Sequence, residues 1–255
     1  MKTHIETFIF AHDQRIILDM EQNQKFADIP NLRYVLVGDC ENKEVAGNPR
    51  VIIEAEHNPN YIYKNRNLLS FTGWLLLFNH GLIGPMTTHV NLFEYDIKLS
   101  GNIISEIERC IAETDPDVIG YIQIPAKTPM YADEPRFCKE IVESINKNHG
   151  WNVMDVVNQY KQFNGDVSVT SNHTLSVGAF NKFMNFMKPC VADIEDNKYG
   201  GHQTERALSF YYLGESDVSV VVLPNCLFHY QLDTHQTQNI PVEKYLNNYD
   251  AVVKK

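Results

Sequence analysis

The first 150 residues alternate short apolar runs with longer segments of helical periodicity, and this alternation restricts the fold more than any other feature of the sequence. Short apolar runs are typical of strands, whereas apolar residues at helical spacing are typical of amphipathic helices. The runs predict strands over residues 6–11, 32–37, 51–55, 90–99 and 118–124. The spacing predicts helices over residues 13–24, 63–82, 100–114 and 135–150. Strands that alternate with helices in this way predict an α/β fold, a layered αβα sandwich around a mostly parallel central sheet.

No internal repeat, low-complexity tract or Pro/Gly/Ser-rich linker divides the 255 residues. A chain of this length is able to bury one large core or two modest ones. We therefore expect one domain over residues 1–255.

The net charge of −10 restricts the partners of the chain. A surface of this sign repels a nucleic-acid backbone, so we expect no nucleic-acid partner. The N-terminal residues lack an apolar signal region, and the most apolar segment, residues 71–78, is far too short to span a membrane. The five cysteines are scattered without a CxxC pair, which is typical of reduced thiols. These features predict a cytoplasmic protein, with peripheral contact at a membrane left open.

Polar residues follow directly on the predicted strands. These residues are His12 and Asp13, Asp39, residues 56–58, and Glu94 with Asp96. In open α/β sheets, ligands bind outside the carboxyl ends of the parallel strands. Loops are polar in any protein, but a shared position at one edge of the sheet predicts a ligand site there.

The pair Glu94 and Asp96 has the strongest chemical implication. If both lie on one strand, their side chains point to the same face, within ~7 Å of each other, and repel unless a cation lies between them. Carboxylate oxygens suit Mg²⁺ and Mn²⁺, which keep positions open for phosphate oxygens. The alternative is a strand end that emerges into water. No GxGxxG or GxxxxGK[ST] motif is present, so neither loop holds the phosphates.

This arrangement resembles the GT-A glycosyltransferases, which use nucleotide-sugar donors. The resemblance is carried by FIFAHD (8–13), VGD (37–39), the segment 65–79 and FEYD (93–96). In that family, residues after the first two strands hold the nucleoside and a D-x-D motif binds metal and diphosphate. The chain departs from the motif at its first acid, where a glutamate stands in place of aspartate.

The resemblance implies a role for each of these segments. It implies that His12, Asp13, Asp39 and Tyr95 contact the nucleotide, and that Glu94 and Asp96 bind the metal. Lys64, Arg66 and Asn67 open the helix before FEYD and are expected to reach the diphosphate or the sugar hydroxyls. A solvated helix start is the alternative for that basic cluster.

The C-terminal half extends the resemblance. Residues 168–187 resemble the acceptor-side strand and its Gly-containing loop, with Gly178 in the loop. Residues 200–213 resemble the helix that carries the catalytic acid, with Glu205 at the matching position. Residues 218–231 resemble the last strand, after which a metal-binding histidine often follows, and His229 is the nearest match.

Alternatives remain open for the residues of this half. Glu205 shares a helix face with His202 and is equally suited to complement the helix dipole. Asp193, Glu195 and Asp196 are rival bases. His229 lies in an apolar strand, where a histidine is more often packed than a ligand, and His235 is a weaker alternative.

The resemblance therefore implies a metal-assisted glycosyltransferase. Its expected donor is a nucleotide-diphosphate sugar, its metal Mn²⁺ or Mg²⁺, and its acceptor a hydroxyl of a glycan or lipid-linked glycan. It implies a nucleotide-sugar half over residues 1–100 and an acceptor half over residues 101–255. A general base is required only if transfer inverts configuration, and the transferred sugar is either a hexose or a pentose. The alternatives are a nucleotidyltransferase that makes the nucleotide sugar, and a catalytically silent binding protein on the same scaffold.

Overall fold

The structure of the chain is a computed structural model. It describes residues 3–23, 26, 28–38, 43–59, 65–121, 123–125, 135–162, 166–168, 171–223 and 226–229.

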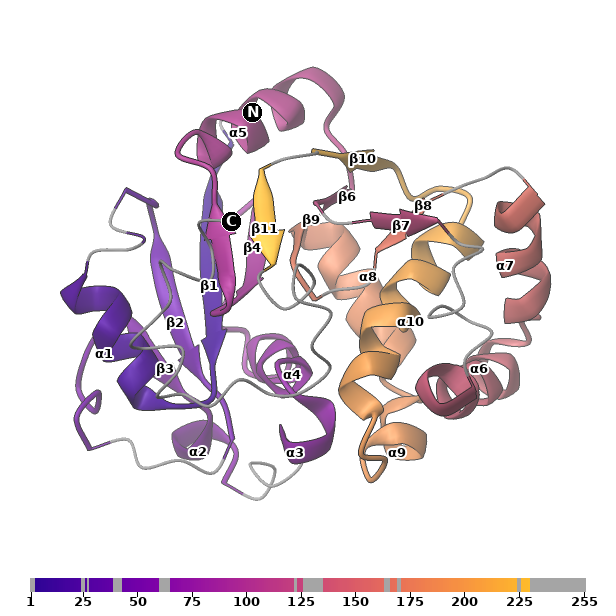
Figure 1. Cartoon of the computed structure of the whole chain (residues 1–255), viewed down its shortest axis with the longest axis horizontal. Helices are drawn as coiled ribbons and strands as arrows, with labels where there is room; N and C mark the ends of the chain where they lie inside the picture. Colours follow the sequence, from indigo (N-terminus) through magenta and orange to yellow (C-terminus); the bar gives the residue numbers. More distant parts are fainter. Residues whose placement is uncertain are drawn as a thin grey trace.

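The described strands and helices alternate through most of the chain (Figure 1). The strands are β1 (Ile5–Ala11), β2 (Leu32–Leu36), β3 (Val51–Ile53), β4 (His89–Glu94), β5 (Ile97–Leu99), β6 (Val118–Gly120), β7 (Gln123–Pro125), β8 (Asp166–Ser168), β9 (His173–Ser176), β10 (Val220–Val222) and β11 (Leu227–His229). The helices are α1 (Gln14–Gln22), α2 (Glu54–His57), α3 (Asn65–Leu68), α4 (Phe71–Asn79), α5 (Ile103–Thr114), α6 (Pro135–His149), α7 (Val153–Gln162), α8 (Val177–Met187), α9 (Val191–Ile194) and α10 (Gly200–Gly214).

The central sheet has seven strands in the order β10-β6-β9-β4-β1-β2-β3. Each neighbouring pair is parallel except the two pairs that involve β9, which runs antiparallel to β4 and β6. Two small sheets, β11-β5 and β7-β8, complete the described pairing. The predicted mostly parallel sheet is confirmed.

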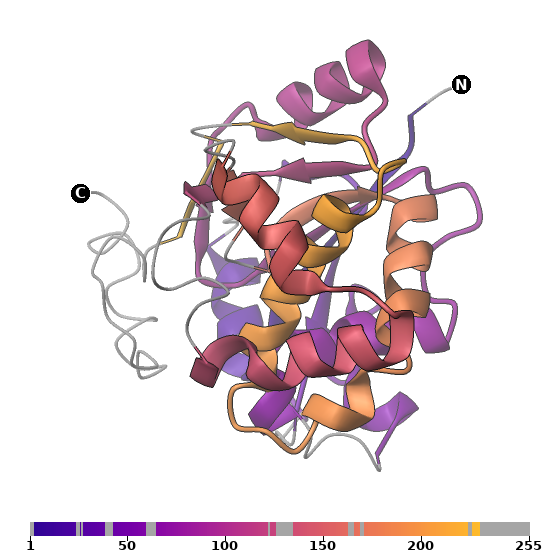
Figure 2. The same cartoon turned by 90° about the vertical axis from the view of Figure 1, so that its right-hand side faces the viewer.

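Both faces of the sheet are covered by helices. Alternate residues of β1 point to opposite faces, so Phe8 and Phe10 join a core with α4, α8 and α10, whereas Ile9 joins a second core with α1 and α5. Figure 1 shows the sheet between these helices, and the view in Figure 2 shows α6 and α7 on the outer side of α10. The layered αβα sandwich is therefore confirmed.

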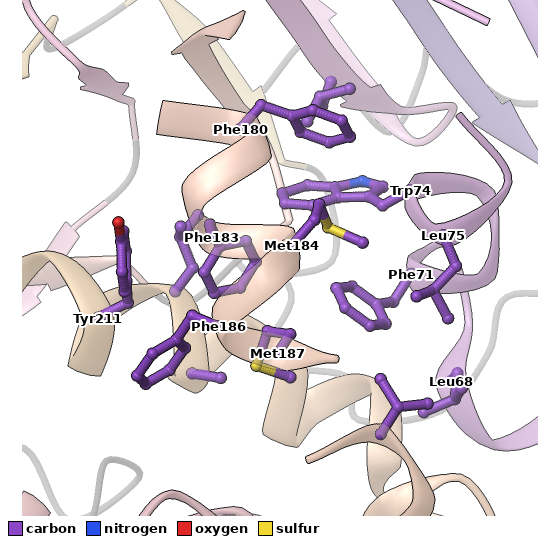
Figure 3. Packing of buried hydrophobic residues seen from close by; sticks show 14 of the residues in the cluster. Leu68, Phe71, Trp74, Leu75, Phe180, Phe183, Met184, Phe186, Met187 and Tyr211 are labelled. Carbon is purple, nitrogen blue, oxygen red and sulfur yellow. The ribbon is translucent and has the colours of Figure 1, made fainter. Parts of the chain in front are cut away.

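Aromatic side chains fill the core between α4 and α8 (Figure 3). The Trp74 ring lies 6.2 Å from the Phe183 ring and 6.4 Å from the Phe180 ring, both in tilted or edge-on contact. Helix α4 approaches β1 closely because Gly73 has no side chain, and a Cβ at that position would lie 2.5 Å from the Phe10 ring. This contact places the N-terminal turn of α4 against the sheet.

A buried hydrogen-bonded network crosses four strands of the sheet. Asn91 on β4 donates to the Thr7 hydroxyl on β1 (2.9 Å) and accepts from the Thr174 hydroxyl on β9 (2.6 Å). Thr174 also bonds the hydroxyl of Tyr121, which directly follows β6, and burial raises the pKa of that tyrosine. All four side chains are essentially buried, so the network fixes these strands relative to one another.

Some predicted elements are divided or shortened in the structure. The predicted helix over residues 63–82 breaks at Leu69, whose φ of 53° ends α3 before α4 begins. The predicted strand over residues 118–124 separates into β6 and β7, which belong to different sheets. The predicted third strand ends at Ile53, because the next four residues form α2. Gly178 lies within α8 rather than in a loop.

Candidate active site

The carboxyl ends of four parallel strands meet at one edge of the sheet. β1, β2, β3 and β4 are adjacent and parallel, so the residues that follow them lie along that edge. The predicted gathering of strand-end residues is therefore confirmed for those that the structure describes. Glu94, the last residue of β4, is in register with Phe10 of β1.

The Glu94–Asp96 segment forms a turn rather than a continuous strand. β4 ends at Glu94, Tyr95 and Asp96 form the turn, and β5 starts at Ile97 in a separate small sheet. The expectation that both acids lie on one strand is therefore wrong, because the chain leaves the central sheet between them. We call residues 94–96 the carboxylate turn.

Hydrogen bonds to the backbone fix the carboxylate turn from both sides. The Tyr95 N–H donates to the carbonyl of Phe10 (3.1 Å), and the Glu94 N–H donates to the side-chain oxygen of Asn172 (2.7 Å). The Ser70 hydroxyl donates to the Glu94 carboxylate (3.0 Å) from the residue before α4. Asp96 is buried, with 5% of its surface exposed.

His173, which no sequence pattern singles out, lies beside Glu94. His173 is fully buried at the start of β9, next to Leu92 of β4. Burial lowers the pKa of His173 to about 4, although the backbone of Ser171 and the charge of Glu94 act in the opposite direction. The imidazole is therefore neutral near pH 7. The available signal is a polar pair, Asn172-His173, at the start of a short strand, but the sequence does not reveal that this strand is antiparallel and begins at the carboxyl edge of the parallel strands.

His12 and Asp13 follow β1, as predicted. The His12 ring packs edge-on against the Tyr95 ring at 5.1 Å, and burial lowers the His12 pKa although the charge of Asp13 opposes this shift. Asp13 is the N-cap of α1: its carboxylate accepts from the backbone N–H of Arg15 (2.8 Å) and pairs with the Arg15 guanidinium (2.7 Å). Burial tends to raise the Asp13 pKa, but the bonds and charge of Arg15 outweigh it and hold the pKa below its usual value. These contacts favour a structural role for Asp13.

A second residue missed by the sequence analysis is Glu54, which directly follows β3. Its side chain is 1% exposed and accepts a 2.6 Å hydrogen bond from the backbone N–H of Gly38, after β2. Burial raises the Glu54 pKa, although the bonds from Gly38 and Thr72 oppose the shift. Glu54 therefore ties the end of β2 to α4. Asp39, the residue that follows Gly38, lies outside the described residues.

The basic cluster before α4 is only partly described. Lys64 and the side chain of Arg66 lie outside the described part of the structure. Asn67 donates from its side-chain amide to the carbonyl of Glu195 (2.9 Å), after α9. This bond joins the α3 segment to the C-terminal half of the chain.

The first turns of α10 lie beside α3 and α9 (Figure 1). A Cβ at Gly201 would lie 2.6 Å from the Leu69 side chain, and one at Gly200 would lie 2.8 Å from the carbonyl of Ile194. Glycine at both positions therefore permits close packing of α10 on the segment that leads to Ser70, which contacts the carboxylate turn.

Two side chains on α10 contact the Glu205 carboxylate. The carboxylate lies 2.9 Å from the Arg206 guanidinium and 3.5 Å from the imidazole of His202. The Glu205 side chain is 11% exposed, whereas the His202 side chain is 44% exposed. Glu205 therefore lies just below the surface, with the imidazole outside it.

The rival acids have different surroundings. Asp193 accepts from the Ser144 hydroxyl (2.6 Å) and lies 3.7 Å from the Lys147 ammonium group, both on α6. The hydrogen bond from Ser144 lowers the pKa of Asp193, and the charge of Lys147 adds to this effect. Asp196 is exposed after α9. These contacts favour a structural role for Asp193.

The predicted third metal ligand is not tested. His229 ends β11, which pairs with β5 directly after the carboxylate turn, but its side chain and His235 lie outside the described part. Within the described residues, no group of three or more His, Cys, Asp or Glu side chains is arranged to hold a metal ion. Glu94 and Asp96 nevertheless supply the oxygen donors that Mg²⁺ and Mn²⁺ prefer, and these ions commonly complete their coordination with water and phosphate oxygens.

Solved glycosyltransferases have a similar arrangement of strands and helices. The apo structure of the bifunctional glycosyltransferase WbbM matches with a TM-score of 0.59 and 10% sequence identity, over 88% of this chain and 46% of that chain. The fold is that of the GT-A glycosyltransferases. The resemblance expected from the sequence is thus confirmed at the level of the fold, and the chain spans less than half the length of WbbM.

Two further GT-A structures match less closely. Glucosyl-3-phosphoglycerate synthase from Mycobacterium tuberculosis, in complex with Mn²⁺, uridine diphosphate and glucosyl-3-phosphoglycerate, has a TM-score of 0.48 at 10% identity, over 98% of this chain and 78% of that chain. Mouse xyloside xylosyltransferase 1, in its apo form, has a TM-score of 0.41 at 10% identity, over 98% and 94%. No family model and no curated protein sequence matches the chain. Among the described helices, none combines the length and apolar character required to cross a bilayer.

Proposed function

We propose that the chain is a glycosyltransferase that transfers a sugar from a nucleotide-diphosphate donor to a hydroxyl acceptor. The observation that carries this proposal is the carboxylate turn, which lies at the carboxyl edge of the parallel strands in a GT-A fold. We also keep the expectation that residues 1–255 form one domain, with the donor half first and the acceptor half second.

Glu94 and Asp96 are proposed to hold a divalent cation, Mn²⁺ or Mg²⁺, with His229 as the third protein ligand. When bound there, the ion neutralises charge on the diphosphate as it leaves, which is Lewis-acid catalysis. Ser70 and Asn172 hold Glu94 at its carboxylate and its backbone, so the ligand is oriented before the donor binds. Neutral His173 fills the space beside Glu94 without adding a positive charge that would compete with the cation.

The nucleotide is proposed to lie beyond β1 and β2, against His12, Tyr95 and Asp39. The edge-on contact between the His12 and Tyr95 rings gives this side an aromatic surface next to the carboxylate turn. Lys64, Arg66 and Asn67 are the proposed contacts of the diphosphate or the sugar. The acceptor is proposed to bind at the first turns of α10, which carry His202 and Glu205. The transferred sugar is a hexose or a pentose, and the acceptor is a glycan or a lipid-linked glycan; the scheme suits each combination equally.

Donor binding and hydrolysis test the proposal without knowledge of the acceptor. The protein is mixed with Mn²⁺ and a panel of nucleotide sugars, and thermal shift and release of nucleoside diphosphate are measured. We expect one donor to stabilise the protein and to be hydrolysed slowly. Asp96→Asn is expected to lower hydrolysis about 100-fold or more, because the charge that binds the cation is lost.

Asp28→Asn is the matched control, since Asp28 is exposed and precedes β2, at the opposite edge of the sheet. Donor binding without hydrolysis would favour a silent binding protein, and release of product only from a nucleoside triphosphate would favour a nucleotidyltransferase. Equal hydrolysis by the Asp96→Asn and Asp28→Asn variants would disprove the role of the carboxylate turn.

A further inference from the structure

Three side chains on α10 form a chain of contacts that runs from the surface into the core. His202 Nδ1 lies 3.5 Å from Glu205 Oε2, and Arg206 Nη1 donates to the same oxygen at 2.9 Å. Arg206 Nη1 also donates to the backbone carbonyl of His202 at 3.0 Å. The side chains are 44%, 11% and 4% exposed in the order His202, Glu205, Arg206. The imidazole is thus the outer member of the set and the guanidinium the inner one.

The difference in exposure indicates which side chain can reach an acceptor, His202, and which one supports it, Glu205. A general base must approach the hydroxyl within hydrogen-bonding distance. Glu205 is mostly covered, and its Oε2 already contacts both His202 and Arg206. The imidazole is half-exposed, and its Nδ1 side faces the carboxylate, so Nε2 lies on the opposite side of the ring. A carboxylate that contacts one ring nitrogen fixes the ring orientation and stabilises the imidazolium formed when the other nitrogen takes a proton.

His202 is linked by packing to the segment that holds Glu94. Gly200 and Gly201 directly precede it and pack against residues 67–69, and the next residue along that segment, Ser70, donates to Glu94. The Tyr199 ring lies 6.5 Å from the His202 ring and flanks it on the N-terminal side. The turn that carries His202 therefore packs on the same segment that holds the carboxylate turn.

We infer that His202, rather than Glu205, is the catalytic base of the proposed glycosyl transfer, and that Glu205 is a positioning residue anchored by Arg206. This inference rests on the proposed function. The proton of the acceptor hydroxyl, or of water in hydrolysis, moves to His202 Nε2. The acceptor oxygen forms a bond to the anomeric carbon, and the bond from that carbon to the diphosphate oxygen breaks, with its electron pair leaving on the diphosphate. Transfer by this route inverts the anomeric configuration.

Kinetics of donor hydrolysis, with the donor and metal found for the wild type, test the inference. His202→Ala is expected to lower kcat about 100-fold with the donor KM changed less than about two-fold, because the base acts on the acceptor and not on donor binding. Added imidazole is expected to restore part of the activity of His202→Ala only. Glu205→Gln is expected to lower kcat by a smaller factor, about 10-fold, with an unchanged KM and no imidazole rescue. His80→Ala, an exposed histidine at the end of α4, is the matched control and is expected to keep wild-type activity.

The outcomes separate this inference from the proposed function. A wild type that hydrolyses no nucleotide sugar overturns both. A wild type that is active, together with a folded His202→Ala variant that keeps its kcat, overturns the role of His202 alone. Larger loss in Glu205→Gln than in His202→Ala, without imidazole rescue, would return the role of base to Glu205. His202→Gln, with the melting temperature measured for each variant, provides a second test if the alanine variant folds poorly.

Discussion

The carboxylate turn and the first turns of α10 hold their polar side chains in different ways. The carboxylate turn continues a central strand, and its backbone is bonded to Phe10 on one side and to Asn172 on the other. The first turns of α10 pack instead on α3, α9 and α6. Their position depends on glycines that pack on Leu68 and Leu69, and their charged groups depend on contacts within the helix.

This difference indicates which part of the site tolerates substitution. The position of the carboxylate turn depends on the strand register, which many residues determine together. The first turn of α10 packs so closely on residues 67–69 that a methyl group added at Gly201 meets the Leu69 side chain, while the rest of the helix is also held by α6, α7 and the core. Substitutions that act on one region and not the other test this distinction.

The largest effect is expected in the sheet, from removal of Asn91. Asn91→Ala leaves the hydroxyls of Thr7 and Thr174 without their shared partner and opens a cavity at a fully buried position. We expect a loss of about 2–4 kcal/mol in the free energy of unfolding, measured by urea denaturation. Asn185→Ala is the control, since Asn185 is exposed on α8 and its amide bonds only the preceding turn among the contacts described. A loss below about 1 kcal/mol would show that the network does not fix the strands.

A smaller effect is expected at the start of α10. A methyl group added by Gly201→Ala meets the Leu69 side chain, and we expect a loss of about 1–3 kcal/mol. Leu69→Gly removes the opposing side chain and suits the φ of 53° at that position. The double variant Gly201→Ala/Leu69→Gly is therefore expected to lose less stability than the sum of the two single variants, as measured in a double-mutant cycle. Additive losses would show that this contact does not determine the packing of α10.

The same distinction explains how much of the molecule is predictable from the sequence. The parallel strands were predicted because apolar runs of strand length are local, and their carboxyl ends gather at one edge in any sheet of this type. The prediction that His12 and Glu94 lie at that edge needed only the order of the strands. The break at Leu69 was not predicted, because a leucine with positive φ contradicts its local preference and is retained by tertiary contacts.

The surroundings of the residues that were not predicted are formed by the tertiary fold. His173 lies beside Glu94 only because β9 inserts antiparallel between β4 and β6, and no local pattern fixes that order. Arg206 follows Glu205 directly, but the sequence does not show that its side chain is buried beside the Glu205 carboxylate. The burial of Glu54 is not predictable from its own residue type, because a buried carboxylate contradicts the usual preference of glutamate for the surface.

The smallest effect concerns Glu54, which shows that an acid at the carboxyl edge need not bind a ligand. Glu54→Gln keeps an acceptor for the Gly38 N–H, so at pH 4 we expect stability within about 1 kcal/mol of the wild type. Burial raises the Glu54 pKa in the folded state above its unfolded value. The protonated form of Glu54 is therefore favoured by folding, and its contribution to stability is complete below the unfolded pKa and lost as pH rises through the folded pKa.

The glutamine variant lacks this titration, so its stability relative to the wild type is expected to increase as pH rises from 4 through the folded pKa and then to level off. Urea denaturation across this pH range measures the difference. Glu56→Gln is the matched control, because Glu56 is exposed on the same short helix and its removal is expected to leave the pH dependence unchanged. If the difference in unfolding free energy between Glu54→Gln and the wild type stays constant with pH, burial does not raise the Glu54 pKa. Burial would then not distinguish Glu54 from the acids of the carboxylate turn.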